Sequence, residues 1–474
     1  MVNTRDSESL VSSSNLLGAV YFYLKYTYRK IYNCPFFTIN SMVKENLSKQ
    51  IKENNIKWIQ VHFTDLIGSL RVIHIPASRF LKDDVASKGI NFDGSSVGFR
   101  KVEKSDMIAL PDRNTLKQIP YEKDEAMIRA DLYDTDYAAY RAGPRNILKK
   151  AIEKAKKSGY DKVMISPEME FCCFKKYSDE ESGYKEGITY FSAPPLDDLK
   201  EYRKILSDVL MESGFEVKYH HHEKGKFQHE IEVKGLEALQ AADFCSYFKF
   251  VAREIAKDFD INITFMPKPL SEEAGSGMHA HITLYNKGKN IFLDTKNEYN
   301  LSKTALYFIG GILDHSRGIA AFANPTLNSY KRLIPNFEAP IYIAWDRYNR
   351  SSLIRIPAKK NVDIEVRNAD PAANPYFLFA SFIYAGLDGI KNKTTYKPVS
   401  RNIYQMTDKE IKEYKIKQLP TNLMEALLEL QKDKVLADGI GNDALELFIQ
   451  KKVDEWNKVL DKAFPDLPKR ETAG

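Results

Sequence analysis

The stretch 166–174, SPEMEFCCF, carries two glutamates one residue apart in an otherwise apolar run. Neighbouring side chains of a strand alternate between its faces, so Glu168 and Glu170 share one face while Met169 and Phe171 share the other. Two like charges side by side repel, and burying them without a partner is costly. The strand therefore either has one solvated face or holds something positive beside its two carboxylates.

The same spacing recurs in three later strand-like runs, QHEIEV, GMHAHITL and DIEVR. Four such runs predict strands that line one polar cavity, with HHHE at 220–223 adding a further acid. Several carboxylates with few histidines favour Mg²⁺ or Mn²⁺ over zinc. Their number indicates two ions, and paired divalent ions suit phosphoryl transfer. The acidic and histidine members of this set are Glu168, Glu170, Glu223, Glu230, Glu232, His279, His281 and Glu365.

Basic residues accompany the acids. Arg332 lies in NSYKRL, and Arg350 and Arg355 lie in NRSSLIRIP. Arginines in an apolar strand are poor core residues unless they face anions, and guanidinium groups match phosphate and carboxylate geometry. An acidic substrate with a transferable phosphate is therefore expected, although the chain has neither a Walker A sequence nor a kinase glycine-rich loop. In GSGMH, Gly275 and Gly277 would let the backbone approach a small ligand closely.

Length and composition are typical of a two-domain globular protein. The chain has 474 residues, of which 43% are hydrophobic and 28% charged, and its net charge of +6 is too small and dispersed to favour nucleic acid. The four cysteines show no CxxC spacing, which favours a reducing, cytoplasmic location.

The predicted organisation has three parts. Residues 1–41 are expected to be a mobile extension, or to result from a start codon placed too far upstream, with Met42 beginning the working chain; their apolar run is too short to span a membrane. A sheet-rich unit covers 42–140, with a helix over 43–53 and a hairpin turning at Gly68. A larger unit, 141–474, begins with a helix at Pro144 and interleaves strands with long helices.

These motifs together resemble the glutamine synthetase family in its bacterial and archaeal class I form. The resemblance runs from about Ile51 to the C-terminus and rests on the ordered set NFDGSSVGF, SDMIALPD, EMEF, HHE with QHE, FMPKPL, GSGMHAH, NPTLNSYKRL, NRSSLIRIP, IEVR and DPAANPY. It implies an α+β fold: a small β-grasp-like N-terminal domain and a large catalytic domain whose curved antiparallel sheet forms a funnel flanked by helices. It also implies a homo-oligomer, expected to be a dodecamer, with active sites between subunits.

The resemblance further implies the reaction and the residue roles. ATP would phosphorylate L-glutamate to a γ-glutamyl phosphate, which ammonia then attacks. By motif position, one metal ion would be held by Glu170, Glu223 and Glu230, and another by Glu168, His279 and Glu365. The substrates would be bound by Gly275, Arg332, Arg350 and Arg367, and the nucleotide by His281, Thr283 and Arg355. The catalytic set would be Asp93 from a neighbouring subunit, which deprotonates ammonium, together with Tyr190, Glu338 and Arg350.

Four positions depart from the family pattern: Phe227, Ala274, Asn336 and Asp363. All lie where substrate or nucleotide would be placed, and none is an expected metal ligand. Two alternatives to ammonia ligation stay open: transfer to a larger amine such as ethanolamine or a polyamine, and a catalytically silent paralogue. The presence of Asp93 and Tyr190 favours ammonia, and the complete ligand set argues against a silent protein.

Overall fold

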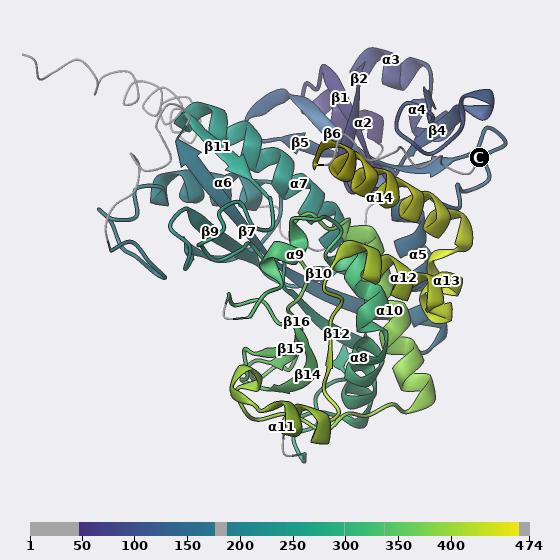
Figure 1. Ribbon diagram of the computed structural model, residues 1–474. Helices are drawn as coiled ribbons and strands as arrows, with labels where there is room; N and C mark the ends of the chain where they lie inside the picture. The colour runs from purple at the N-terminus through teal and green to yellow at the C-terminus, as the bar shows by residue number, and fades with distance from the viewer. Residues whose placement is uncertain (1–46, 176–186, 298, 336, 464–474) are drawn as a thin grey trace, which may run out of the picture.

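The computed structural model describes residues 47–175, 187–297, 299–335 and 337–463, so the 1–41 extension and Asn336 lie outside the described residues. Two sheets organise these ranges, a six-stranded one near the N-terminus and an eleven-stranded one in the rest of the chain. Figure 1 shows the smaller sheet at one end of the molecule, with the larger sheet and its helices below it. The expected α+β architecture is confirmed.

The smaller sheet has the strand order β2-β1-β6-β4-β3, with β5 paired to β6. Its central pair, β1 and β6, is parallel, whereas β1 and β2 form the expected antiparallel hairpin. The hairpin turns at Gly68, whose φ of +88° is strained for any other residue, and Asp65 accepts hydrogen bonds from the backbone of Ile67 and Ser69. The helices and strands of this N-terminal part are α2 (Leu47–Glu53), β1 (Trp58–Thr64), β2 (Leu70–Pro76), α3 (Ala77–Lys82), α4 (Val85–Lys88), β3 (Ile90–Asp93), β4 (Asp106–Pro111), β5 (Lys117–Ile119) and β6 (Glu122–Tyr133).

The larger sheet runs in the order β17-β14-β15-β16-β12-β7-β9-β8, with β10 and β11 also paired to β7 and β13 to β12. Its strands pair in antiparallel fashion, as expected, with one exception. β14 and β15 are parallel, which the sequence did not predict. Its strands are β7 (Lys162–Lys175), β8 (Val217–His222), β9 (Gln228–Val233), β10 (Leu236–Glu237), β11 (Ile261–Thr264), β12 (Ala280–Asn286), β13 (Lys289–Asn290), β14 (Tyr342–Arg347), β15 (Ser352–Ile356), β16 (Ile364–Val366) and β17 (Lys417–Gln418).

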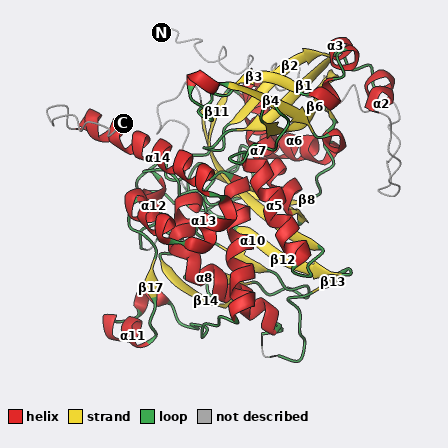
Figure 2. Ribbon diagram, turned by 90° about the vertical axis from the view of Figure 1, so that its right-hand side faces the viewer, coloured by secondary structure: helices red, strands yellow, loops and turns green. Residues whose placement is uncertain are grey.

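Helices cover one face of the larger sheet, as the layer of α5, α10 and α8 in Figure 2 shows. Glycines let α8 and α10 approach closely, since a Cβ built on Gly311 would lie 2.0 Å from the carbonyl oxygen of Ala385. Within the described ranges, no helix combines the length and apolar character that a membrane crossing requires. The helices are α5 (Pro144–Lys157), α6 (Lys200–Glu212), α7 (Ala238–Ala256), α8 (Lys303–Ala323), α9 (Ser329–Arg332), α10 (Pro375–Asn392), α11 (Asp408–Glu413), α12 (Leu423–Lys432), α13 (Lys434–Ile440) and α14 (Asn442–Ala463).

The core side of β7 explains why the SPEMEF strand is held in place. Met169 and Phe171 are fully buried, and the ring of Phe171 packs 6.2 Å from that of Tyr202 on α6 and 5.8 Å from that of Phe248 on α7. Burying one such side chain contributes about 1.5–3 kcal/mol. Because the residues alternate, this packing directs Glu168 and Glu170 to the opposite face of the sheet.

Candidate active site

The two glutamates of β7 lie opposite two more on β9. The strand register pairs Glu168 with Glu232 and Glu170 with Glu230, and directly opposed residues of an antiparallel pair share a face. Glu170, Glu230 and Glu232 are buried. The two strands thus present a strip of four acids, whose charges require compensation from other elements.

The histidine before β12 and the histidine on β12 supply one compensating group. Nδ1 of His279 lies 2.9 Å from Oε2 of Glu168, and Nε2 of His281 lies 2.7 Å from Oε1 of the same carboxylate. His279 also lies 3.5 Å from Glu365, which the register places directly opposite His281. His279 thus contacts both acids expected with it at one metal site, but the set whose ligand atoms all lie within 4.8 Å of one another has His281 in its place.

A second group surrounds Glu230. Both ring nitrogens of His221 lie 3.8 Å from carboxylate oxygens, one of Glu223 and the other of Glu230. Glu170 is adjacent, and its Oε2 accepts a hydrogen bond of 2.8 Å from the backbone of Gly277. Glu223 and Glu230 thus form a candidate ligand set with His221, whereas Glu170, the third acid expected for the other metal site, lies next to this set and not in it.

The protonation behaviour of these acids reveals an excess of negative charge. Burial and the neighbouring Glu223 raise the pKa of Glu170 to about 8. Burial, together with Glu168 and Glu170, raises the pKa of Glu230 well above its usual range. A divalent cation would relieve this repulsion, and carboxylate oxygens with a few imidazoles are donors that Mg²⁺ and Mn²⁺ accept. Ligand atoms within 4.8 Å of one another occur in three sets: Glu168, His281 and Glu365; His221, Glu223 and Glu230; and Glu168, Glu230 and Glu232.

Arginines border the acids and keep free donors. Glu365 is held between Nη1 of Arg355 at 2.7 Å and Nη1 of Arg367 at 2.6 Å. Arg332 is buried and donates to the carbonyl of Asn368 at 2.7 Å. The Nε atoms of Arg332 and Arg367 are buried and have no hydrogen-bond partner among the described residues. Buried donors without partners are rare, and arginines in such a position are candidates for binding an anionic substrate.

The GSGMH loop approaches the charged groups as closely as its glycines permit. A Cβ built on Gly277 would lie 2.7 Å from Nη2 of Arg332 and 2.9 Å from Nε2 of His279. A Cβ on Gly275 would lie 2.5 Å from the carbonyl oxygen of Pro267. A side chain at either position would therefore force its neighbours to shift, and the close approach of this backbone to a ligand stays a prediction.

His281 links the acids to the segment before β16. Its Nδ1 lies 3.0 Å from Asp363, which also pairs with Lys359 at 3.0 Å. Burial opposes protonation of His281, but the negative charges of Glu168 and Asp363 outweigh it and raise its pKa to about 10. Asp363, one of the four departures, is thus neutralised locally by a histidine and a lysine. Thr283 is buried further along β12.

Two of the expected catalytic residues lie at the rim of the acids. The ring of Tyr190 meets that of His221 edge-on at 5.4 Å, and burial together with Glu223 and Glu230 raises the pKa of Tyr190 to about 12. Glu338, with a φ of +67°, pairs with Lys224 from the β8–β9 turn at 2.5 Å. This hydrogen bond lowers the pKa of the Glu338 carboxyl.

Arg350 and Asp93 lie outside the hydrogen-bonded cluster. Arg350 is exposed between β14 and β15, near enough to Tyr190 and Glu338 to lower both of their pKa values. Asp93 ends β3 in the smaller sheet, where bonds from Ser95 and Ser96 lower its pKa to about 2. It is therefore an ionised, exposed carboxylate, and its delivery to a neighbouring subunit stays a prediction.

Sequence reasoning missed His221 and Lys224 as members of the site. His221 lies within the HHHE motif and Lys224 follows it, but a histidine run and a loop lysine carry no spacing signal until the β8–β9 hairpin folds. Of the departures, Phe227 packs against Phe174 with ring centroids 5.1 Å apart, so its side chain is used in local packing. Nothing in the structure explains Ala274.

Comparisons with known proteins identify the family. The family model described as "Glutamine synthetase, beta-Grasp domain" matches residues 55–135, and "Glutamine synthetase, catalytic domain" matches residues 141–466. The glutamine synthetase of Thermus thermophilus is 40% identical over 428 residues, covering 87% of this chain and 95% of that protein. The glutamine synthetase of Pyrococcus furiosus is 43% identical over 413 residues, covering 86% and 92%.

Solved structures show the same fold. A chain described as "GmaS/ADP complex-Conformation 1" superposes with a TM-score of 0.81 at 28% identity, covering 88% of this chain and 96% of that one. A chain described as "Apo GmaS without ligand" gives a TM-score of 0.80 at 29% identity with the same coverage. Both domains and most of the chain length are therefore accounted for, and the protein belongs to the glutamine synthetase family.

Proposed function

We propose that this chain ligates ammonia to L-glutamate at the expense of ATP, through a γ-glutamyl phosphate, releasing glutamine, ADP and phosphate. The observation that carries the proposal is the strip of buried, mutually repelling carboxylates facing buried arginine nitrogens without partners. Such a site is poised to take up cations and an anionic substrate together. The kinship with glutamine synthetases at about 40% identity supports the same reaction.

The acids are proposed to hold at least two Mg²⁺ or Mn²⁺ ions. When bound, these would neutralise phosphate charge during transfer. The proposed ligands are Glu168, His279 and Glu365 for one ion and Glu170, Glu223 and Glu230 for the other, with His221 beside the latter. His281 lies as close to Glu168 as His279 does, so its proposed role toward the nucleotide rests on the family resemblance.

Substrate binding is assigned to the groups that border the acids. Arg332 and Arg367 would bind the glutamate carboxylate and the phosphate, assisted by Arg350 and the Gly275 backbone. His281, Thr283 and Arg355 would contact ATP. The free donors of the buried arginines support their part in this assignment, since binding an anion satisfies them.

The amination step needs a base and an enclosed pocket. Ammonium is not a nucleophile until it loses a proton, which Asp93 of a neighbouring subunit would accept. Ammonia then attacks the γ-carbonyl carbon, phosphate leaves, and Glu338 takes the second proton. The low pKa values of Asp93 and Glu338 mean that both are ionised at neutral pH and can attract ammonium.

A larger amine is the second candidate acceptor. The two solved structures carry the name GmaS, for γ-glutamylmethylamide synthetase, so the fold accommodates an amine other than ammonia. Phosphate release from ATP should be measured with glutamate and, in turn, ammonium, methylamine, ethanolamine and a polyamine. A higher kcat/KM for ammonium than for every other amine supports the proposal. A preference for methylamine or a larger amine would transfer the assignment to that acceptor.

A further inference from the structure

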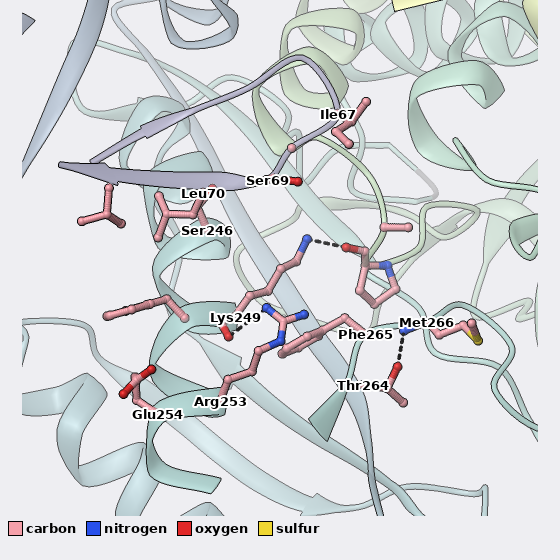
Figure 3. Close-up of a pocket in the computed structure, with 15 residues that line it drawn as sticks. Ile67, Ser69, Leu70, Ser246, Lys249, Arg253, Glu254, Thr264, Phe265 and Met266 are labelled. Carbon is pink, nitrogen blue, oxygen red and sulfur yellow. Dashed lines mark hydrogen bonds between the residues drawn. The ribbon is translucent and has the colours of Figure 1, made fainter. Parts of the chain in front are cut away.

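A pocket that includes none of the candidate active-site acids is lined by the β1–β2 turn, α7 and the end of β11 with the residues that follow it (Figure 3). Its volume is about 490 Å³, within the range of small-molecule sites. The β1–β2 turn, residues 67–70, forms one wall, α7 contributes Lys249 and Arg253, and Phe265 and Met266 follow β11. Its lining includes none of the residues assigned above to metal, substrate or nucleotide.

Two cations face this pocket without an acidic partner. The amine of Lys249 donates to the carbonyl of Pro371, and Nη1 of Arg253 donates to the carbonyl of Lys249 at 3.3 Å. The guanidinium carbon of Arg253 lies 4.9 Å from the ring centroid of Phe265. Among the described residues, neither cation forms an ion pair of 4.0 Å or less. Glu254, the one acid in the lining, pairs with Lys257 at 2.7 Å instead.

Lys249 is half-buried and Arg253 is exposed, and partial desolvation disfavours the charged form of both side chains. This desolvation lowers the pKa of Lys249 to about 8 and lowers that of Arg253. Arg253 lowers the pKa of Lys249 further, whereas Cys245 and Asp370 raise it by less than burial lowers it. A bound anion would supply the missing charge, and a guanidinium stacked on an aromatic ring is preorganised to bind a carboxylate.

The remaining lining is apolar and partly open to solvent. Met266 is 47% exposed, and Ile67, Leu70 and Phe250 are half-buried. Together the walls combine two cationic side chains with apolar surface that a ligand could cover. Such a combination selects molecules with one charged end and an apolar body.

We propose that this pocket binds a small organic carboxylate with an apolar body, held through Lys249 and Arg253. The proposal goes beyond the proposed function and does not depend on it. The carboxylate would lie against the two cations, and the apolar body against the β1–β2 turn and Met266. Ligation of glutamate takes place elsewhere, so loss of this binding would leave the assignment of the reaction untouched.

Photolabelling of the assembled enzyme tests the proposal. The probe is 4-azidobenzoate, and its uncharged counterpart is 4-azidobenzamide; labelled peptides are mapped by mass spectrometry. The expected result is labelling within 67–72, 246–254 and 264–266 that excess benzoate suppresses. Labelling with the benzamide should be at least fivefold weaker.

Variants show whether the charges are responsible. Arg253 lies on the exposed side of α7, so its replacement should leave the fold intact. Both Arg253→Met and Lys249→Met should reduce pocket labelling at least fivefold. Arg79→Met, an exposed arginine on α3, is the matched control and should label like the parent. Equal labelling by the two probes, labelling that benzoate does not suppress, labelling elsewhere, no labelling, or parent-level labelling of Arg253→Met would each overturn the proposal.

Discussion

At the scale of the residue, Glu170 is a buried acid whose charged form is unfavourable. It is buried, accepts hydrogen bonds from Gln228 and Gly277, and has a pKa raised to about 8 by burial and Glu223. The protein therefore keeps this carboxyl at a position where its ionised form is unfavourable without a cation. That is the behaviour expected of a ligand rather than of a structural acid.

We predict that Glu170→Ala abolishes turnover with Mg²⁺ while leaving the fold largely intact, since losing a ligand lowers ion affinity. Steady-state phosphate release across a Mg²⁺ titration measures the effect, and circular dichroism checks the fold. Glu216→Ala, an exposed glutamate paired with Lys234, is the control. Parental turnover of Glu170→Ala at sub-saturating metal would contradict the ligand assignment.

Lys224 supports a prediction about the amine pocket. Its amine lies 2.5 Å from Glu338, where a substrate ammonium would be attracted. Since exposed ion pairs are worth about 0–1 kcal/mol, Lys224→Met should lower KM for ammonium by about two- to fivefold with little change in kcat. Lys226→Met, which loses a pair with Glu273 instead, is the control. An unchanged or raised KM would show that Lys224 and ammonium do not compete for Glu338.

Asp93 allows proton transfer to be separated from binding. Asp93→Ala should still form γ-glutamyl phosphate but should lose about 10²–10⁴-fold in rate with ammonium, the usual range for a missing general base. Hydroxylamine is already a neutral nucleophile at pH 7, so the defect with it should be much smaller. The ratio of the two rates, variant against parent, is the measurement. An equal fall with both nucleophiles would mean that Asp93 only binds substrate or supports an interface.

At the scale of the element, the apolar face of β7 anchors this strand against α6 and α7. Phe171→Ala removes a fully buried ring that packs against α6 and α7, and such substitutions cost about 3–5 kcal/mol. The expected result is a markedly lower unfolding midpoint in denaturant. Tyr414→Ala, whose residue is 49% exposed, should shift the midpoint by far less. Similar shifts for both would mean that β7 is not anchored by this packing.

At the scale of the molecule, residues 1–41 are predicted to be dispensable. The family match begins only at residue 55, so a chain lacking 1–41 should keep its assembly and specific activity. Size-exclusion chromatography and the phosphate-release assay measure the two properties. The family resemblance predicts that the full-length protein and the shortened protein both form a dodecamer. A smaller species after the deletion would make the extension structural.

The sequence alone predicted the local features, because they depend on periodicity and turn chemistry. Alternation placed Glu168 and Glu170 on one face of a strand, Gly68 marked the hairpin, and Pro144 marked the start of α5; all three are confirmed. Motif resemblance then named the family, which the comparisons confirm.

Only the tertiary structure decided which groups meet. His221 and Lys224 join the acids through the β8–β9 hairpin, whose strands and turn place side chains by register rather than by sequence motif. The pocket around Lys249 and Arg253 depends on α7, β11 and a hairpin nearly two hundred residues earlier in the chain. A sequence specifies spacing along one element, whereas charge compensation and desolvation depend on elements that become neighbours only when the chain folds.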